Sequence, residues 1–170
     1  MVLLVSEEIA RNFSEAPLYI IGSGQASDAA THDRPTLTSL PAARQAARQA
    51  YEMARITPQD VDAVEVHDCF TIAEIIASED LGFFEAGEGW KAAEDGVTSL
   101  KGTRPINSSG GLKSKGHPVG ASGVGQVVEI WHQLRGEAGE RQIPGSPAIG
   151  LTHNVGGTGQ TCVVNIFERR

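Results

Sequence analysis

Hydrophobic residues recur along the chain with two periods, and these predict helices alternating with strands. Alanines spaced by three and four residues give one small apolar face to a helix expected over 41–56. Isoleucines with the same spacing favour a second helix over 71–81, and a third is expected over 127–134. Short apolar runs bounded by glycine or polar residues predict strands at 2–5, 17–22, 61–66, 148–152 and 161–167.

The polar segments between these elements complete the expected outline. Ser6 is a candidate cap for a helix over 7–13, whereas 23–39 and 82–102 are expected to be loops. The last two strands, separated by 153–160, are expected to form a hairpin. Strands that alternate with helices predict a layered α/β domain in which helices cover a mixed or partly parallel sheet.

Composition and charge narrow the class of protein. The chain has 170 residues and a formal charge of −7, from 14 basic and 21 acidic residues, which argues against a nucleic-acid or membrane-surface binder. No apolar run approaches the ~20 residues that a membrane span requires, so no membrane span is expected. Two cysteines cannot build a disulfide framework, and this indicates a reducing compartment, with the cytoplasm as the expected location.

Three polar clusters lie at predicted strand ends or helix starts. His67-Asp68-Cys69-Phe70 follows the 61–66 strand, and Gly116-His117-Pro118 precedes the 127–134 helix. His153-Asn154 follows the 148–152 strand. Because ligands bind at the carboxyl ends of strands in open α/β sheets, the chemistry of this chain is expected at one rim of the fold.

Cys69 is the stronger candidate of the two cysteines. It lies just before a predicted helix and close to His67, and a helix N-terminus and neighbouring imidazoles both favour the thiolate form. Such a thiol serves as a nucleophile or as a proton shuttle, and the alternative is a small buried core cysteine. Cys162 lies inside an apolar strand without an ionisable neighbour and is expected to be part of the core.

His117 belongs to a segment of unusual charge. Residues 97–128 contain four lysines or arginines and no acidic residue, in a chain whose net charge is negative. Glycines there let the backbone approach a ligand, and a neutral imidazole can stabilise a developing oxyanion or deprotonate a thiol. The alternative is a solvated basic loop with a structural histidine.

The third cluster leaves two interpretations open. Backbone N–H groups near Gly156 and Gly157 form either a second oxyanion site or an ordinary hairpin turn. The histidines and Cys69 could bind zinc only if they met in space, and no paired-ligand spacing such as C-x-x-C or H-E-x-x-H is present. No metal site is therefore predicted.

Three sequence segments resemble the thiolase superfamily. GGLKSKGHPVGASG at 110–123 is similar to the GHP-containing segment of that family, and HDCF at 67–70 is similar to the corresponding loop of sterol-carrier-protein-type thiolases. LTHNVGGTGQ at 151–160 resembles their final loop, which replaces the Cys-x-Gly of other thiolases. The resemblance covers only the carboxyl-terminal half of that family's protomer. It implies a layered thiolase-like half over 17–170, with 1–16 as a linker or the end of a preceding half.

The resemblance also implies a reaction and roles for individual residues. The family cleaves 3-ketoacyl-CoA thiolytically or condenses two acyl-CoAs, with a coenzyme A thioester as substrate and no other cofactor. His117 would activate the nucleophile and help to stabilise an enolate oxygen, Cys69 would be the acid/base, and His67 would contribute to the enolate oxyanion hole. The residues expected to line the substrate site are Gly116, Phe70, Asn154, Gly156 and Gly157.

One part of the family's machinery is absent from this sequence. The nucleophilic cysteine belongs to the amino-terminal half, so the isolated chain is expected to be inactive without that half or a partner chain. A lone half is also expected to expose an apolar face and to associate, as a homo-oligomer or with its partner. The alternatives are a thiolase-like retro-aldolase or a lipid- or CoA-binding subunit with an OB-fold partner, and a metal or redox module.

Overall fold

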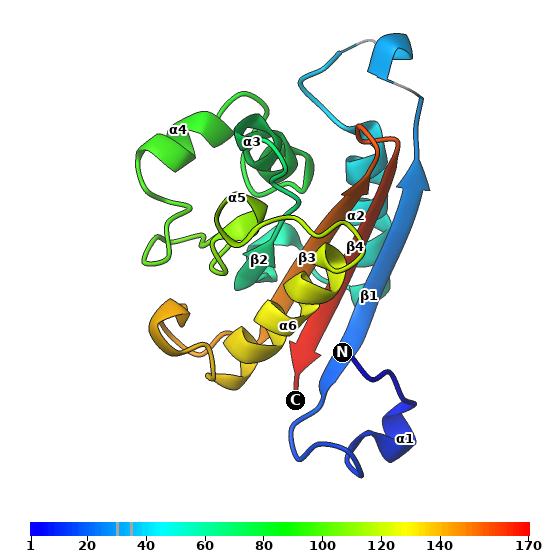
Figure 1. Ribbon diagram of the computed structural model, residues 1–170, viewed down its shortest axis with the longest axis vertical. Coiled ribbons are helices and arrows are strands. Elements are labelled where there is room, and N and C mark those ends of the chain that lie inside the picture. The colour runs from blue at the N-terminus through cyan, green and yellow to red at the C-terminus, as the bar shows by residue number, and fades with distance from the viewer. Residues whose placement is uncertain (30, 35) are drawn as a thin grey trace.

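A computed structural model describes residues 1–29, 31–34 and 36–170 of the chain. Helices and strands alternate in the first part of the chain, four α-helices then follow one another, and two strands come last (Figure 1). The strands are β1 (Leu18–Ser27), β2 (Ala63–Glu65), β3 (Ile149–Gly156) and β4 (Thr161–Arg169). The α-helices are α1 (Glu7–Ala10), α2 (Pro41–Ala54), α3 (Thr71–Asp80), α4 (Gly89–Glu94), α5 (Gly111–Lys115) and α6 (Ser122–Arg135). Short 3-10 turns occupy Thr31–Asp33, Pro58–Asp60 and Gly139–Arg141.

The four strands form one mixed sheet in the order β1-β4-β3-β2. β4 pairs antiparallel with both β1 and β3, whereas β2 runs parallel to β3. The hairpin expected between the last two strands is confirmed, with Gly156 opposite Thr161 at its tip. The mixed α/β class is therefore confirmed, and the parallel pair brings the end of β2 next to the middle of β3.

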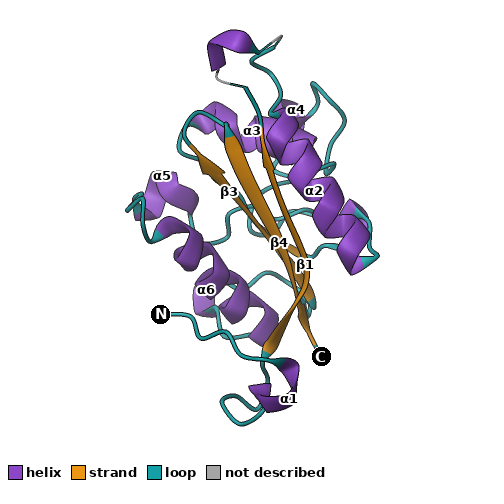
Figure 2. Cartoon of the chain, turned by 90° about the vertical axis from the view of Figure 1, so that its right-hand side faces the viewer, coloured by secondary structure: helices purple, strands orange, loops and turns teal. Residues whose placement is uncertain are grey.

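Helices cover both faces of the sheet, with α2 and α6 on opposite sides (Figure 2). The face of α2 that meets the sheet consists of alanines, which leave almost no space between helix and strand. Gly22 and Gly24 of β1 complete this contact, because a Cβ at either position would overlap a carbonyl oxygen of α2, that of Ala50 or Ala46. Small residues on both surfaces thus fix how closely α2 approaches β1.

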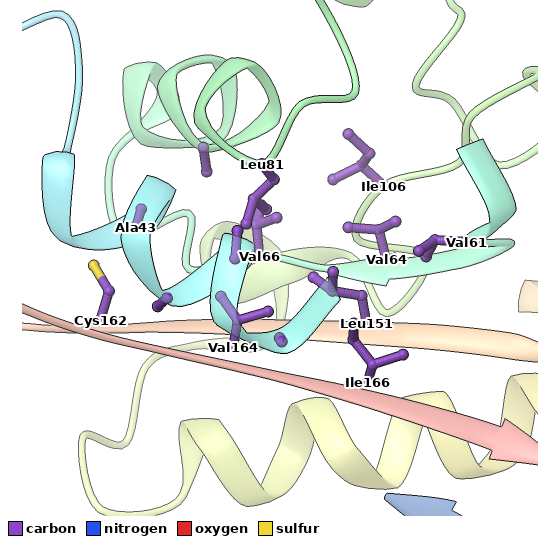
Figure 3. Close-up of a cluster of buried hydrophobic side chains, with 14 of the residues drawn as sticks. Ala43, Val61, Val64, Val66, Leu81, Ile106, Leu151, Cys162, Val164 and Ile166 are labelled. Atoms are coloured by element: carbon purple, nitrogen blue, oxygen red, sulfur yellow. The ribbon is translucent and has the colours of Figure 1, made fainter. Parts of the chain in front are cut away.

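Two apolar cores lie on the two sides of the sheet. The larger one joins α2, the sheet and the region of α3, and Figure 3 shows Val64, Val66 and Leu151 meeting Leu81 and Ile106 there. The smaller one packs α6 against the sheet through Ile130 and Leu134, which contact Ala63 and Phe167. Val64 also forms a parallel bridge with Ile106, so the segment before the glycine-rich loop lies beside β2.

Several boundaries differ from those that the pattern predicts. No strand forms at 2–5, whose apolar side chains are exposed and line a surface groove, and the first helix ends at Ala10. β1 continues through Ser27, where a loop is expected, because every residue from 22 to 27 pairs with β4. The loop expected over 82–102 contains α4, and α6 begins at Ser122 instead of 127. Pairing with a neighbouring strand overrides the low strand propensity of a glycine- and serine-rich segment.

No helix within the described ranges is both long enough and apolar enough to cross a membrane.

The glycine contact with α2 gives a stability test. Gly24→Ala is expected to lower the free energy of unfolding by about 1–3 kcal/mol, the usual cost of overpacking, because the new methyl group meets the Ala46 carbonyl. The matched control is Gly125→Ala in α6, where a Cβ meets nothing within 4 Å and alanine favours the helix. Urea unfolding measures both, and equal stability of the two variants would contradict the packing described.

Candidate functional site

The loops that carry His67 and His117 meet although fifty residues separate them. The two imidazole rings lie edge to face, with centroids 4.9 Å apart and an interplanar angle of 87°. His67 lies two residues after the end of β2, and His117 lies between α5 and the start of α6. Two of the three polar clusters singled out from the sequence therefore form one site.

Asp68 joins the first loop to α5. Its Oδ1 accepts a hydrogen bond of 2.7 Å from the backbone N–H of Leu112, in the first turn of α5. The carboxylate occupies the space where a side chain on Gly111 would lie, and Gly111 has a φ of +63° that favours glycine. A buried acid at this helix start fixes the direction of α5 and hence of the chain that leads to His117.

Glu65 ties the same two segments together from the end of β2. This carboxylate is 1% exposed and accepts hydrogen bonds from the backbone N–H and the hydroxyl of Ser109, at 3.1 and 2.6 Å. The ammonium of Lys115 lies 3.3 Å from it. Burial raises the pKa of Glu65, whereas Lys115 and Ser109 act in the opposite direction. The sequence offered no signal for this contact, because an acid inside an apolar strand and a lysine fifty residues later are joined only by the fold.

Asn107 holds the end of β2 from the other side. Its side-chain oxygen accepts a hydrogen bond from the N–H of Val66 at 2.8 Å, and its amide donates to Glu74 of α3 at 2.8 Å. The residue has a φ of +56°, a left-handed conformation that asparagine tolerates better than most residues. It therefore fixes β2, the following loop and α3 in one arrangement.

The fold uses two of the four cations in the basic segment. Lys115 pairs with Glu65, and Arg104 donates hydrogen bonds to the carbonyls of Pro58 and Val61. Lys101 and Lys113 are exposed. The positive charge expected to attract an anion beside His117 is therefore smaller than the composition suggests.

Around the histidine pair the surface is open. The segment from Gly116 to Ala121 is exposed, and Gly116 has a φ of +87°. Cys69 is half-buried between His67 and Phe70, and Phe70 is the exposed N-cap residue of α3. The expected placement of Cys69 just before a helix is confirmed. If the chemistry of the chain lies at one rim of the fold, the sulfur of Cys69 is expected to face the ring of His117, and this contact stays a prediction.

Cys162 is a core residue, as expected. It is completely buried on β4 among the residues of the larger core, and burial raises the pKa of its thiol to about 12. The thiol is therefore protonated at neutral pH and unsuited to nucleophilic attack.

His67 and His153 are buried. Nδ1 of His67 and both ring nitrogens of His153 have no hydrogen-bond partner within the described residues. Burial lowers the pKa of His67, and the neighbouring His117 adds to this, while Asp68 opposes it. Burial, assisted by the positive charge that a protonated His67 would carry, lowers the pKa of His153 to about 3. Both rings are therefore neutral at physiological pH.

The expectation that His153 follows a strand is wrong. β3 extends to Gly156 because each of its residues pairs with β4, and His153, opposite Val164, is 0% exposed inside this strand. The end of β3 cannot be located from its own side chains alone, because backbone hydrogen bonds to β4 continue the strand beyond its apolar residues.

Asn154 connects the last loop to α6. Its amide donates to Gln126 at 3.1 Å, and the Gln126 amide donates to the carbonyl of His153 at 3.0 Å. Gly157, with a φ of +63°, forms the turn into β4 just after Gly156. The segment thus forms a hairpin turn, and an oxyanion site at its backbone N–H groups stays a prediction.

Metal ligands are not grouped in the part of the chain that the structure describes: no three His, Cys, Asp or Glu side chains there are placed to hold an ion.

A family model described as "Thiolase C-terminal domain-like" matches residues 23–169. The chain belongs to the thiolase family. It is 53% identical over 169 residues to an acetyl-CoA acetyltransferase of Methanothermobacter thermautotrophicus, covering 99% of this chain and 44% of that protein. It is 45% identical over 125 residues to human sterol carrier protein 2, covering 74% of this chain and 22% of the relative. The chain thus spans less than half the length of these two relatives, and the family model that it matches is that of a thiolase carboxyl-terminal domain.

Solved structures agree with this assignment. The structure titled "Ltp2-ChsH2(DUF35) aldolase" superposes with a TM-score of 0.86 at 26% identity, over 97% of this chain and 43% of that one. A monomeric SCP2-thiolase-like protein type 1 from Mycobacterium smegmatis shares the fold, with a TM-score of 0.66 at 20% identity, over 89% of this chain and 29% of that one.

Removal of the buried charge at Glu65 tests the link between the two loops. Glu65→Gln leaves Lys115 without its counter-charge, and the free energy of unfolding is expected to fall by about 1–3 kcal/mol. Glu52→Gln is the matched control, because Glu52 is exposed on α2 and its ion pair with Arg48 spans 3.9 Å. Chemical denaturation measures both, and an unchanged Glu65→Gln variant would show that the ion pair does not hold the loops.

The buried His153 makes stability depend on pH. A histidine with a lowered pKa in the folded state contributes stability above its unfolded pKa, and this contribution is lost as the pH falls. As the pH falls from about 7 to about 4.5, the free energy of unfolding of the native chain is expected to decrease by about 2–3 kcal/mol more than that of His153→Leu, whose side chain does not titrate. Parallel pH profiles for the two proteins would show that His153 is accessible to protons when folded.

Proposed function

We propose that this chain supplies the acid/base half of an acyltransferase site of the thiolase class. The reaction is thiolytic cleavage of a 3-ketoacyl-CoA, or its reverse, the condensation of two acyl-CoAs. The observation that carries the proposal is the edge-to-face contact of His67 and His117, which joins two separate loops at 4.9 Å. Breaking a carbon–carbon bond next to a thioester requires stabilisation of an enolate oxygen and delivery of a proton, and these side chains are suited to both tasks.

His117, Cys69 and His67 each take one task. In the thiolytic direction a nucleophilic thiolate attacks the 3-keto carbon. The electrons of the breaking carbon–carbon bond then form the enolate of the departing acyl-CoA. His117 accepts the proton of the nucleophilic thiol, and Cys69 donates a proton to the α-carbon. His67, which burial keeps neutral, donates an N–H to the enolate oxygen. Gly116, Phe70, Asn154, Gly156 and Gly157 line the site for the thioester.

The nucleophile comes from an amino-terminal thiolase half, joined to this chain or assembled with it. Of the two cysteines here, Cys162 is buried in the core and Cys69 takes the acid/base role. A groove of about 930 Å³, lined by apolar side chains of β1 and α6 and by residues 1–5, agrees with a face that another domain covers. In this proposal 17–170 form the domain, 1–16 are the linker or the end of the preceding half, and the assembly is a cytoplasmic homo-oligomer.

A retro-aldolase is the second candidate, because the structural neighbour with a TM-score of 0.86 is titled an aldolase. In that case an OB-fold partner would complete the site. A tyrosine acid/base is the expected mark of such relatives, but Tyr51 on α2 is partly buried and donates to the carbonyl of Leu81 at 3.0 Å. Burial raises the pKa of the Tyr51 hydroxyl above its ordinary value. Cys69, two residues after His67 in the sequence, favours the acyltransferase.

Reconstitution tests the proposal. The chain is combined with the amino-terminal half of the Methanothermobacter relative, and cleavage of acetoacetyl-CoA by free CoA is followed. The mixture is expected to be active, whereas the chain alone is not, and Cys69→Ser or His117→Gln is expected to lower the rate at least about 100-fold.

Cys162→Ala is the matched control for the loss of a thiol and is expected to retain the rate. Two results would contradict the proposal: a mixture no more stable and no more active than its parts, or variants at Cys69 and His117 as active as the native chain. Cleavage of a 3-hydroxyacyl-CoA in place of the 3-keto compound would support the aldolase.

A further inference from the structure

Ser122 lies against the ring of His117 in the first turn of α6. Its hydroxyl oxygen is 2.7 Å from Nδ1 of His117 and 3.1 Å from the carbonyl oxygen of Pro118. The residue is 4% exposed, so water has little access to this hydroxyl. Both contacts involve Oγ of Ser122, which carries a single hydrogen. The donor in each contact can therefore be deduced.

A serine hydroxyl carries one hydrogen, and a carbonyl oxygen can only accept. If that hydrogen points to Pro118, the four-residue back-bond common at helix starts, the hydrogen between the ring and Ser122 must come from Nδ1. The reverse arrangement makes one hydrogen bond in place of two. We propose that Ser122 is a positioning residue that holds His117 in the tautomer protonated at Nδ1, which leaves Nε2 free to accept a proton.

This arrangement needs no rearrangement when the ring gains a proton. A protonated imidazole carries hydrogens on both nitrogens, so Nδ1 still donates to Ser122 and Ser122 still donates to Pro118. In the reverse arrangement the hydroxyl would have to rotate before the ring could donate to it. The chain of donors from His117 to the Pro118 carbonyl is thus already oriented for the charged ring.

The neighbouring His67 restricts where a proton is bound. Its own pKa is lowered by burial and by the positive charge that His117 would carry, so it stays neutral when His117 is protonated. Asp68, the acid next in sequence, is engaged with the backbone of α5. Ser122 therefore determines which nitrogen of His117 is free to accept a proton.

The tautomer can be measured without catalysis. Long-range proton–nitrogen NMR spectra of the labelled 170-residue chain, at a pH where the ring is neutral, show which nitrogen of each histidine carries the hydrogen. His117→Gln assigns the signals. The native chain is expected to show a protonated Nδ1 and a bare Nε2 for His117, and Ser122→Ala is expected to shift the ring toward a mixture of tautomers. Ser122→Thr keeps a hydroxyl and is expected to preserve the native pattern, while the amide spectrum reports whether each variant is folded.

A protonated Nε2 in the native chain, or an unchanged tautomer in folded Ser122→Ala, would overturn the inference. Its consequence for catalysis rests on the proposed function and is tested separately in the reconstituted enzyme. There Ser122→Ala is expected to lower kcat about 10-fold to 100-fold with little change in KM, and Ser122→Thr is expected to restore the rate. If the tautomer shifts as expected but kcat does not fall, the assignment of Ser122 stands and the role of His117 as base is wrong.

Discussion

Two buried carboxylates at the end of β2 hold the site together. Glu65 accepts from Ser109 and Lys115, and Asp68 accepts from the backbone of α5. A carboxylate removed from water is costly unless donors replace its hydration, so these acids favour only the arrangement in which the glycine-rich segment lies against β2. The contact between His67 and His117 follows from that constraint. His67 lies next to Asp68, and His117 lies two residues after Lys115, which pairs with Glu65.

The rest of the fold supplies the frame for this contact. Alanines on α2 and glycines on β1 bring that helix close to one face of the sheet, and α6 packs on the other face with His117 just before its start. The apolar layers thus place α6, whose positive end and Ser122 hydroxyl lie beside the ring of His117. An apolar groove between β1 and α6 remains open on the same molecule, as a half of a larger thiolase would leave it.

Local patterns predicted most elements because strand and helix periodicity depend on neighbours within a few residues. The helix expected over 41–56 is observed as Pro41–Ala54, and the strand expected over 61–66 as Ala63–Glu65. The errors occur where a distant partner decides. Residues 2–5 have strand-like side chains but no strand beside them, whereas 23–27 have poor strand propensity and pair with β4 throughout.

The sequence by itself determined the family and the chemical types available, which are two motif loops with histidines and a thiol. The tertiary structure alone decided how those groups are used. It brought His67 against His117, engaged Lys115 and Arg104 in internal contacts, and buried His153 inside a strand. The physical reason is that residue type sets what a side chain can donate or accept. Desolvation, charge pairing and the position of a proton depend instead on neighbouring groups, which only the sheet register and the packed loops bring close.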